Sequence, residues 1–170
     1  MRKFGILIAI MVICFSVTGI VSAQEDITKH SYCKYCGMDR SKFAHSRVFI
    51  EYEDGTTMGT CSIRCAAVDL LQLDKIPKNI WVGDYNTKQL LDAEKALWVL
   101  GGSKPGVMTK RAKWAFGKKD DVEQFMKEFG GNAVAFDEAI KAAYEDIYAD
   151  TKMIRDRRKM MQQKAMEHKH

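Results

Sequence analysis

The chain has 170 residues, of which 46% are hydrophobic and 29% charged, a composition typical of globular proteins and not of disordered or collagen-like chains. This length fits one compact domain with an appendage. The net charge of +5 is too low for a strongly electrostatic nucleic-acid binder, and we expect no nucleic-acid partner. Sulfur is the unusual feature, with five cysteines and ten methionines.

Residues 1–23 have the pattern of a secretory signal peptide. Arg2 and Lys3 precede an apolar stretch over 4–20, and the small residues that signal peptidase requires lie in 21–23. Polar residues follow at once, so we expect cleavage after Ala23 and not a retained membrane anchor. Cys14 lies inside the apolar stretch and is removed with it, so an exported, soluble chain with four cysteines remains, in a compartment that permits disulfides.

A hairpin is predicted near the start of the mature chain. Apolar and polar residues alternate over 47–53, a second β-rich run covers 56–60, and Asp54-Gly55 between them is typical of a two-residue turn. This register opposes Ile50 to Gly59 and Val48 to Cys61. It places Cys61 on the apolar side of the hairpin and Met58 on the other.

The remaining elements follow from hydrophobic periodicity. We expect helices over 62–73, over 120–129 and from Asp137 onward, and strands beginning at 80–82 and over 97–100, 114–116 and 133–136. Both halves show the order strand, strand, helix, strand, so the predicted fold class is α+β, with two ββαβ-type units and a C-terminal helical extension. The expected divisions are the signal peptide 1–23, the first unit 24–94, the second unit 95–136, and a C-terminal helix with a basic, Met-rich tail over 137–170.

The four cysteines of the mature chain form two close pairs. Cys33 and Cys36 make a C-x-x-C turn whose sulfurs can take one metal ion, and Met38 brings a thioether within reach of it. Cys61 and Cys65 are spaced by one helical turn, and we place both in the first turn of the helix over 62–73, where backbone amides favour thiolates. The hairpin between the pairs can bring them together.

Three interpretations of this sulfur set stay open from spacing alone. Copper(I) suits a mixture of thiolates and thioethers. A structural zinc ion suits four cysteines. Two disulfides, or thiol–disulfide exchange, suit an exported protein, although the parallel side chains of Cys61 and Cys65 make a bond between them difficult. No G-x-S-x-G, P-loop or H-E-x-x-H motif occurs, and we expect that the protein is not an enzyme.

Several motifs taken together resemble the NosL family of copper chaperones, which are encoded with nitrous oxide reductase. The similarity extends over about residues 32–139. The matching segments are 33–40, 43–47, 51–55, 59–66, 81–85, 92–95 and 114–116, with Met108 and Gly130-Gly131.

The resemblance implies a periplasmic protein that binds copper(I) and delivers it to the copper-sulfide centre of nitrous oxide reductase. It also implies partnership with a membrane ABC-transporter assembly complex. The family's Cys-x-Met element matches Cys36 and Met38, which become the first candidate ligands. The supporting candidates are Cys33, Cys61, Cys65 and, as a thioether contact, Met108; His30 and His45 are weaker ones.

The tail over 152–170 lies outside the resemblance and holds seven Lys/Arg, two acidic residues and four methionines. A solvated helix end is the simplest interpretation of such a charge run. Weak recruitment of copper by the methionines and the terminal histidines is one alternative. Contact of the basic face with an anionic membrane surface or an acidic partner is the other.

Overall fold

The computed structural model describes residues 24–72 and 74–167. The predicted signal peptide, Cys14 and the terminal histidines lie outside the described residues. The elements in chain order are α1 (Glu25–Lys29), β1 (Val48–Tyr52), β2 (Thr57–Thr60), α2 (Ile63–Leu70), β3 (Pro77–Gly83), β4 (Leu90–Asp92), β5 (Leu97–Leu100), β6 (Lys113–Phe116), α3 (Lys119–Phe129), β7 (Asn132–Val134) and α4 (Phe136–Glu167).

The strands form two antiparallel sheets on the same plan. One sheet has the order β2-β1-β3-β4 and the other the order β6-β5-β7. In each, the first strand pairs with the second and with the third, and a helix lies between the second and third strands along the chain. The predicted α+β class is confirmed, with two ββαβ-type units and a C-terminal helix, and β4 is an addition that the sequence did not indicate.

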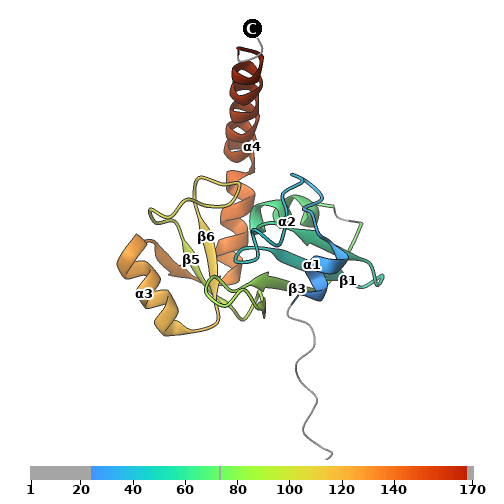
Figure 1. Ribbon diagram of the computed structural model, residues 1–170. Helices are drawn as coiled ribbons and strands as arrows, with labels where there is room; N and C mark the ends of the chain where they lie inside the picture. Colours follow the sequence, from blue (N-terminus) through green and yellow to red (C-terminus); the bar gives the residue numbers. More distant parts are fainter. Residues whose placement is uncertain (1–23, 73, 168–170) are drawn as a thin grey trace, which may run out of the picture.

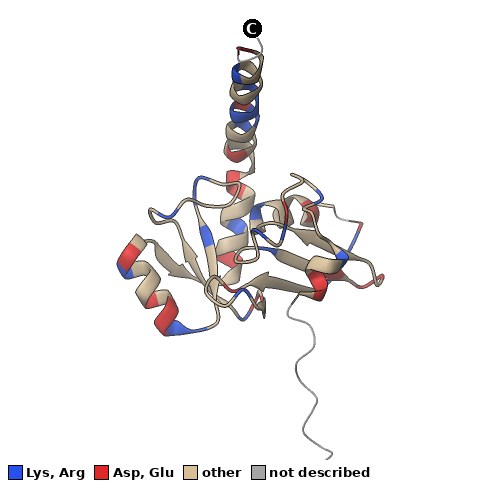
Figure 2. Ribbon diagram, viewed as in Figure 1, with Lys and Arg blue, Asp and Glu red and all other residues tan. Residues whose placement is uncertain are grey.

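The long helix α4 joins the two units. Its buried Ala139 and Ala143 belong to the same core cluster as Ile50 of β1 and Trp98 of β5, and these small side chains let the helix approach α2 of the first unit and β5 of the second closely. In Figure 1, α4 rises between the units and continues well beyond them, and basic residues recur along the projecting part (Figure 2). Among the described residues no helix combines the length and apolar character needed to cross a membrane.

The β1–β2 hairpin differs by one residue from the predicted register. The Tyr52 N–H donates to the Thr56 carbonyl at 3.0 Å, so the loop has three residues and not two. Gly55, at φ +79°, supplies the left-handed residue that closes such a loop as a G1 bulge. The observed pairs include Val48–Thr60 and Ile50–Met58.

The corrected register changes the surroundings of two sulfur residues. Met58 packs against the main core instead of lying on the opposite side of the hairpin. Cys61 comes one residue after the last pair, Val48–Thr60, and so leaves the sheet instead of facing Val48. The Asp-Gly sequence suits both a two-residue and a three-residue loop, which is why it did not decide the register.

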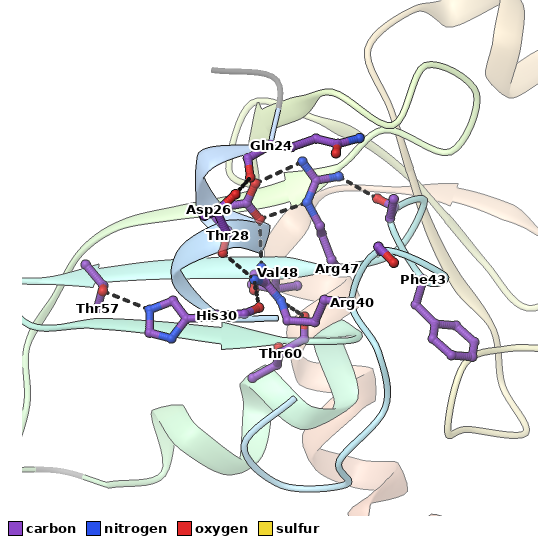
Figure 3. Close-up of polar contacts among 12 residues, drawn as sticks. Gln24, Asp26, Thr28, His30, Arg40, Phe43, Arg47, Val48, Thr57 and Thr60 are labelled. Atoms are coloured by element: carbon purple, nitrogen blue, oxygen red, sulfur yellow. Dashed lines mark hydrogen bonds and ion pairs between the residues drawn. The ribbon is translucent and has the colours of Figure 1, made fainter. Parts of the chain in front are cut away.

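A buried ionic network fastens α1 to the first sheet (Figure 3). Asp26 Oδ2 accepts a hydrogen bond from Arg40 Nη2 and another from Arg47 Nε, each at 2.8 Å, and both guanidinium side chains are 0% exposed. Arg40 also donates to the carbonyls of Thr60 and Val48, both at 3.1 Å. One carboxylate therefore stands against two buried cations, and further donors of both cations are directed at backbone carbonyls of strands, of α1 and of loops.

Gly59 makes room for this network. A Cβ at that position would lie only 2.7 Å from Arg40 Cζ, closer than real contacts allow. The absence of a side chain on β2 thus permits Arg40 to reach the Thr60 carbonyl, one residue before Cys61. The network connects the segment that carries Cys36 and Met38 with the strand end that leads into the second cysteine pair.

We expect Asp26→Asn to lower the free energy of unfolding by about 3–5 kcal/mol, because it removes the carboxylate charge that two buried guanidinium groups contact. Urea denaturation measures this loss. Glu25→Gln removes the same charge from an exposed position of the same helix and should change stability by less than about 0.5 kcal/mol. Equal losses in the two variants would contradict a role for the buried network.

Candidate metal centre

Four cysteine sulfurs converge at one point. The Sγ atoms of Cys33, Cys36, Cys61 and Cys65, here called the thiol quartet, all lie within 4.8 Å of one another. The Cys36–Cys61 distance is 3.4 Å and the Cys61–Cys65 distance 3.8 Å, well beyond the bond length of about 2.05 Å in a disulfide. All four are free thiols, so the described structure contains neither of the two disulfides considered from the sequence.

The C-x-x-C segment folds into a tight knuckle. The Cys33 N–H donates to the Met38 carbonyl, and the Gly37 N–H donates to the Cys33 carbonyl, both at 2.9 Å. Gly37 adopts φ +73°, a left-handed conformation that glycine takes without steric cost. The knuckle directs both sulfurs toward the second pair.

Only one cysteine of the second pair lies in the helix, contrary to the expectation that both occupy its first turn. Ser62 has extended backbone at the N-cap, and α2 begins at Ile63. Cys61 therefore precedes the helix, while Cys65 lies in the first turn, with its N–H donating to the Ser62 carbonyl at 3.1 Å. Because the chain bends at Ser62, the two sulfurs still approach each other closely.

The close packing of the four thiols lowers the pKa values of two of them and raises those of the other two. Hydrogen bonds from Cys36, Cys61 and Cys65 strongly lower the pKa of Cys33. The hydrogen bond with Cys33 raises the pKa of Cys36, but those with Cys61 and Cys65 lower it, and the result is a pKa of about 7. The pKa values of Cys61 and Cys65 are raised, first by their hydrogen bonds to Cys33. The quartet thus carries part of its possible charge, and a metal ion must displace the remaining protons.

Two thioethers complete the sulfur-rich environment. Met38 follows the knuckle and Met108 comes from the loop between β5 and β6, and both pack, partly buried, against the quartet. Met108 has φ +62°, a conformation that costs a residue with a side chain on the order of 1 kcal/mol. The Lys110 N–H, two residues on, donates to Asp150 Oδ1 at 3.1 Å and helps to fix the loop. The centre therefore draws sulfur atoms from both ββαβ units.

All six sulfur residues singled out in the sequence lie at this centre, whereas the two histidines do not. His30 Nε2 is 2.9 Å from Thr57 Oγ1, on the hairpin. The ring of His45 lies 5.5 Å from that of Trp114, in an aromatic cluster. Neither histidine belongs to the group of potential metal-holding residues found in the described part of the chain.

Asp69 is a residue of the site that sequence reasoning missed. It is 3% exposed, and its two carboxylate oxygens accept hydrogen bonds from the hydroxyls of Tyr35 and Tyr52. Tyr35 lies between Cys33 and Cys36, so this contact ties the knuckle to α2. The sequence could have indicated this residue by its spacing, because Asp69 follows Cys65 by one helical turn and is a charged residue in a largely apolar helix.

A groove of about 550 Å³ opens beside the quartet, with Met38 and Met108 among its lining residues. Met153, Ile154 and Arg157 of α4 also line it. Cys33, Cys61 and Cys65 are buried, whereas Cys36 is half-buried. The centre thus has a closed side and a side that faces the groove.

A sulfur cluster at the junction of two ββαβ units defines a scaffold suited to a soft metal ion. The family model of NosL matches residues 24–144, and the chain belongs to the NosL family. The crystal structure of the copper chaperone NosL from Shewanella denitrificans is similar, with a TM-score of 0.54 and 24% identity, over 72% of this chain and 96% of that one. This likeness shows the fold. A comparison with curated proteins found no match.

Alkylation should select Cys36 in the metal-free protein. A thiol reacts when it is both ionised and accessible, and Cys36 combines partial exposure with a lowered pKa. With limiting iodoacetamide at neutral pH, peptide mapping by mass spectrometry should find Cys36 modified first and the other three thiols at least about tenfold more slowly. In Cys36→Ala the fast phase should disappear. Uniform modification of all four would show that the quartet is open to solvent.

Removal of the Asp69 charge should alter tyrosine titration. Burial, and then the carboxylate of Asp69, raise the pKa values of Tyr35 and Tyr52. Since the folded chain holds these protons more tightly than the unfolded chain, stability declines as pH rises above about 10. In Asp69→Asn, the ultraviolet absorbance of phenolate should appear at lower pH, and the alkaline loss of stability should be smaller. Asp74→Asn, at an exposed position, should leave the titration unchanged.

Proposed function

We propose that this protein is a copper chaperone that binds copper(I) through sulfur and passes the ion on by ligand exchange, without catalysing a reaction. The observation that carries the proposal is the convergence of four thiols, with the side chains of two methionines, one from each unit, packed against them. Thiolate and thioether sulfur are the donors that copper(I) prefers, and the ion accepts low coordination numbers. Family membership and the copper chaperone of similar fold support the same choice.

The arrangement suits transfer better than permanent storage. The buried Cys33, Cys61 and Cys65 can retain the ion from one side. Cys36 and Met38 are partly exposed, and Met38 lines the groove, so a donor atom of an acceptor protein has an approach to the metal. A shared ion then passes as bonds to the acceptor first replace those to Cys36 and Met38. The bonds to the buried thiolates break afterwards and these sulfurs take up protons again, with no change in oxidation state.

For location and recipient, the proposal follows the sequence. The N-terminal pattern of charged, apolar and small residues supports export to the periplasm. Resemblance to the NosL family supports nitrous oxide reductase as the recipient and a membrane ABC-transporter complex as a partner in assembly. Neither role requires a catalytic group, and the sulfur centre supplies only binding and release.

Loss of a proposed ligand should weaken copper(I) binding. Under anaerobic competition with a copper(I) chelator, Cys36→Ser should reduce affinity by about 100-fold, or about 2.8 kcal/mol, and Met38→Leu by about tenfold. Met58→Leu is the matched control, because Met58 packs against the main core and not the quartet, and its affinity should equal that of the wild type. Unchanged affinity in both ligand variants would exclude the proposed site.

A structural zinc ion is the second candidate, favoured by the sulfur separations. Four sulfurs at about 2.3 Å from a tetrahedral zinc lie about 3.8 Å apart, and the Cys36–Cys61 and Cys61–Cys65 distances are 3.4 and 3.8 Å. Metal analysis of the anaerobically purified protein separates the candidates. Stoichiometric zinc, with unfolding when a chelator removes it, would favour zinc, whereas a chain that stays folded without metal and takes up copper(I) favours the chaperone.

A further inference from the structure

The groove beside the thiol quartet is positively charged. Its charged lining residues are Lys104, Lys110 and Arg157, and no aspartate or glutamate is among the described residues that line it. The described structure gives the side chains of Lys110 and Arg157 no carboxylate partner. The lining also includes the apolar side chains of Phe43, Val107 and Trp114. The groove is thus suited to a segment that combines apolar groups with negative charge.

Beyond the groove, α4 continues as an exposed stalk, defined here as residues 155–167. It leaves the body of the protein in Figure 1, and it holds five basic and two acidic residues. Three methionines are largely exposed on it, Met160 by 55%, Met161 by 66% and Met166 by 60%. The stalk lies outside the residues that match the family model, so it is a feature of this chain that the family fold does not require.

The groove and the stalk share one side of α4. Met153, Ile154 and Arg157 line the groove, and with 3.6 residues per turn the same side of the helix continues through Met160, Met161 and Lys164. We call these six residues the docking stripe. It leads from the groove, which Met38 and Met108 also line, toward the exposed end of the helix.

The positive charge of the docking stripe favours one kind of binding partner over a second copy of the chain and over a lipid surface. A second copy of the chain would bring an equally basic stalk, which repels the first. A lipid surface binds helices with a wide, uninterrupted apolar face, whereas Arg157 and Lys164 interrupt the methionines here, and the other basic residues of the stalk surround the helix (Figure 2). An acidic protein segment that also carries apolar side chains can form ion pairs with the cations and pack against the polarizable methionine side chains.

We propose that the groove and the docking stripe form one binding surface for an acidic segment of a partner protein. The inference rests on the proposed function, because it identifies this partner as the copper acceptor. Carboxylates of the segment pair with Lys110, Arg157 and Lys164, and its apolar side chains lie against Met160 and Met161. The segment thereby places the acceptor's own metal ligand at the Met38 end of the groove.

A synthetic peptide of alternating glutamate and methionine, labelled with fluorescein, is the probe. Fluorescence anisotropy with the metal-free chain measures its affinity at several salt concentrations. The double variant Arg157→Glu/Lys164→Glu should weaken binding by about tenfold or more and reduce its salt dependence. Lys152→Glu/Lys159→Glu makes the same change of charge on the other side of α4 and should alter affinity by less than about twofold. Circular dichroism checks that both variants keep the helix.

Each other outcome overturns the proposal. Equal losses in the two double variants would mean that net charge, and not the stripe, attracts the peptide. Equal binding of a peptide with glutamine in place of glutamate would remove the charge argument. Binding to vesicles of phosphatidylglycerol and phosphatidylcholine without binding to the peptide would indicate a lipid surface, and concentration-dependent sedimentation would indicate a second copy.

The copper(I) affinity of the wild-type chain is measured separately. If the chain binds copper(I) but not the peptide, the proposal of a docking surface is wrong, whereas the proposed chaperone function is retained. If it binds the peptide through the stripe but not copper(I), the surface stands as a binding site and its assignment to a copper acceptor is wrong.

Discussion

Four thiols packed within 4.8 Å of one another cannot all be ionised, because like charges at that separation repel strongly. Protonation of some thiols, or a cation between them, must relieve the repulsion. The lowered pKa of Cys33 and the raised pKa values of Cys61 and Cys65 express this constraint in the metal-free chain. A soft cation stabilises several thiolates at once, so metal binding and proton release are two sides of one equilibrium.

The scaffold holds the quartet with two polar ties that connect segments distant in sequence. Arg40, just after the knuckle, donates to the Thr60 carbonyl next to Cys61. Tyr35, inside the knuckle, donates to Asp69 on α2, the helix that carries Cys65. The Arg40–Thr60 tie is buried and the Tyr35–Asp69 tie is partly buried, which limits competition from water. The second cysteine pair is thereby positioned against the first from two directions.

Periodicity and spacing predicted the element order and the grouping of the cysteines, because both depend on local patterns. The hairpin register was wrong because Asp54-Gly55 fits loops of two lengths, and only the Tyr52–Thr56 hydrogen bond selects one. Cys61 was misplaced because Ser62, and not an earlier residue, takes the N-cap. The Tyr35–Asp69 contact joins residues 34 positions apart, and no local pattern indicates which hydroxyl a buried carboxylate will meet.

Consecutive residues of α4 contact both halves of the sulfur centre. Arg64, which precedes Cys65, donates from Nη2 to Thr151 Oγ1 at 2.6 Å, and Asp150 accepts from the backbone of the Met108 loop. Arg64 Nε and Asp150 Oδ2 are buried without a partner among the described residues, a cost of about 1–3 kcal/mol for each group. This joint is therefore held below its full hydrogen-bonding capacity. The helix that carries the docking stripe is therefore the same element that positions the Met108 loop relative to the helix of Cys65.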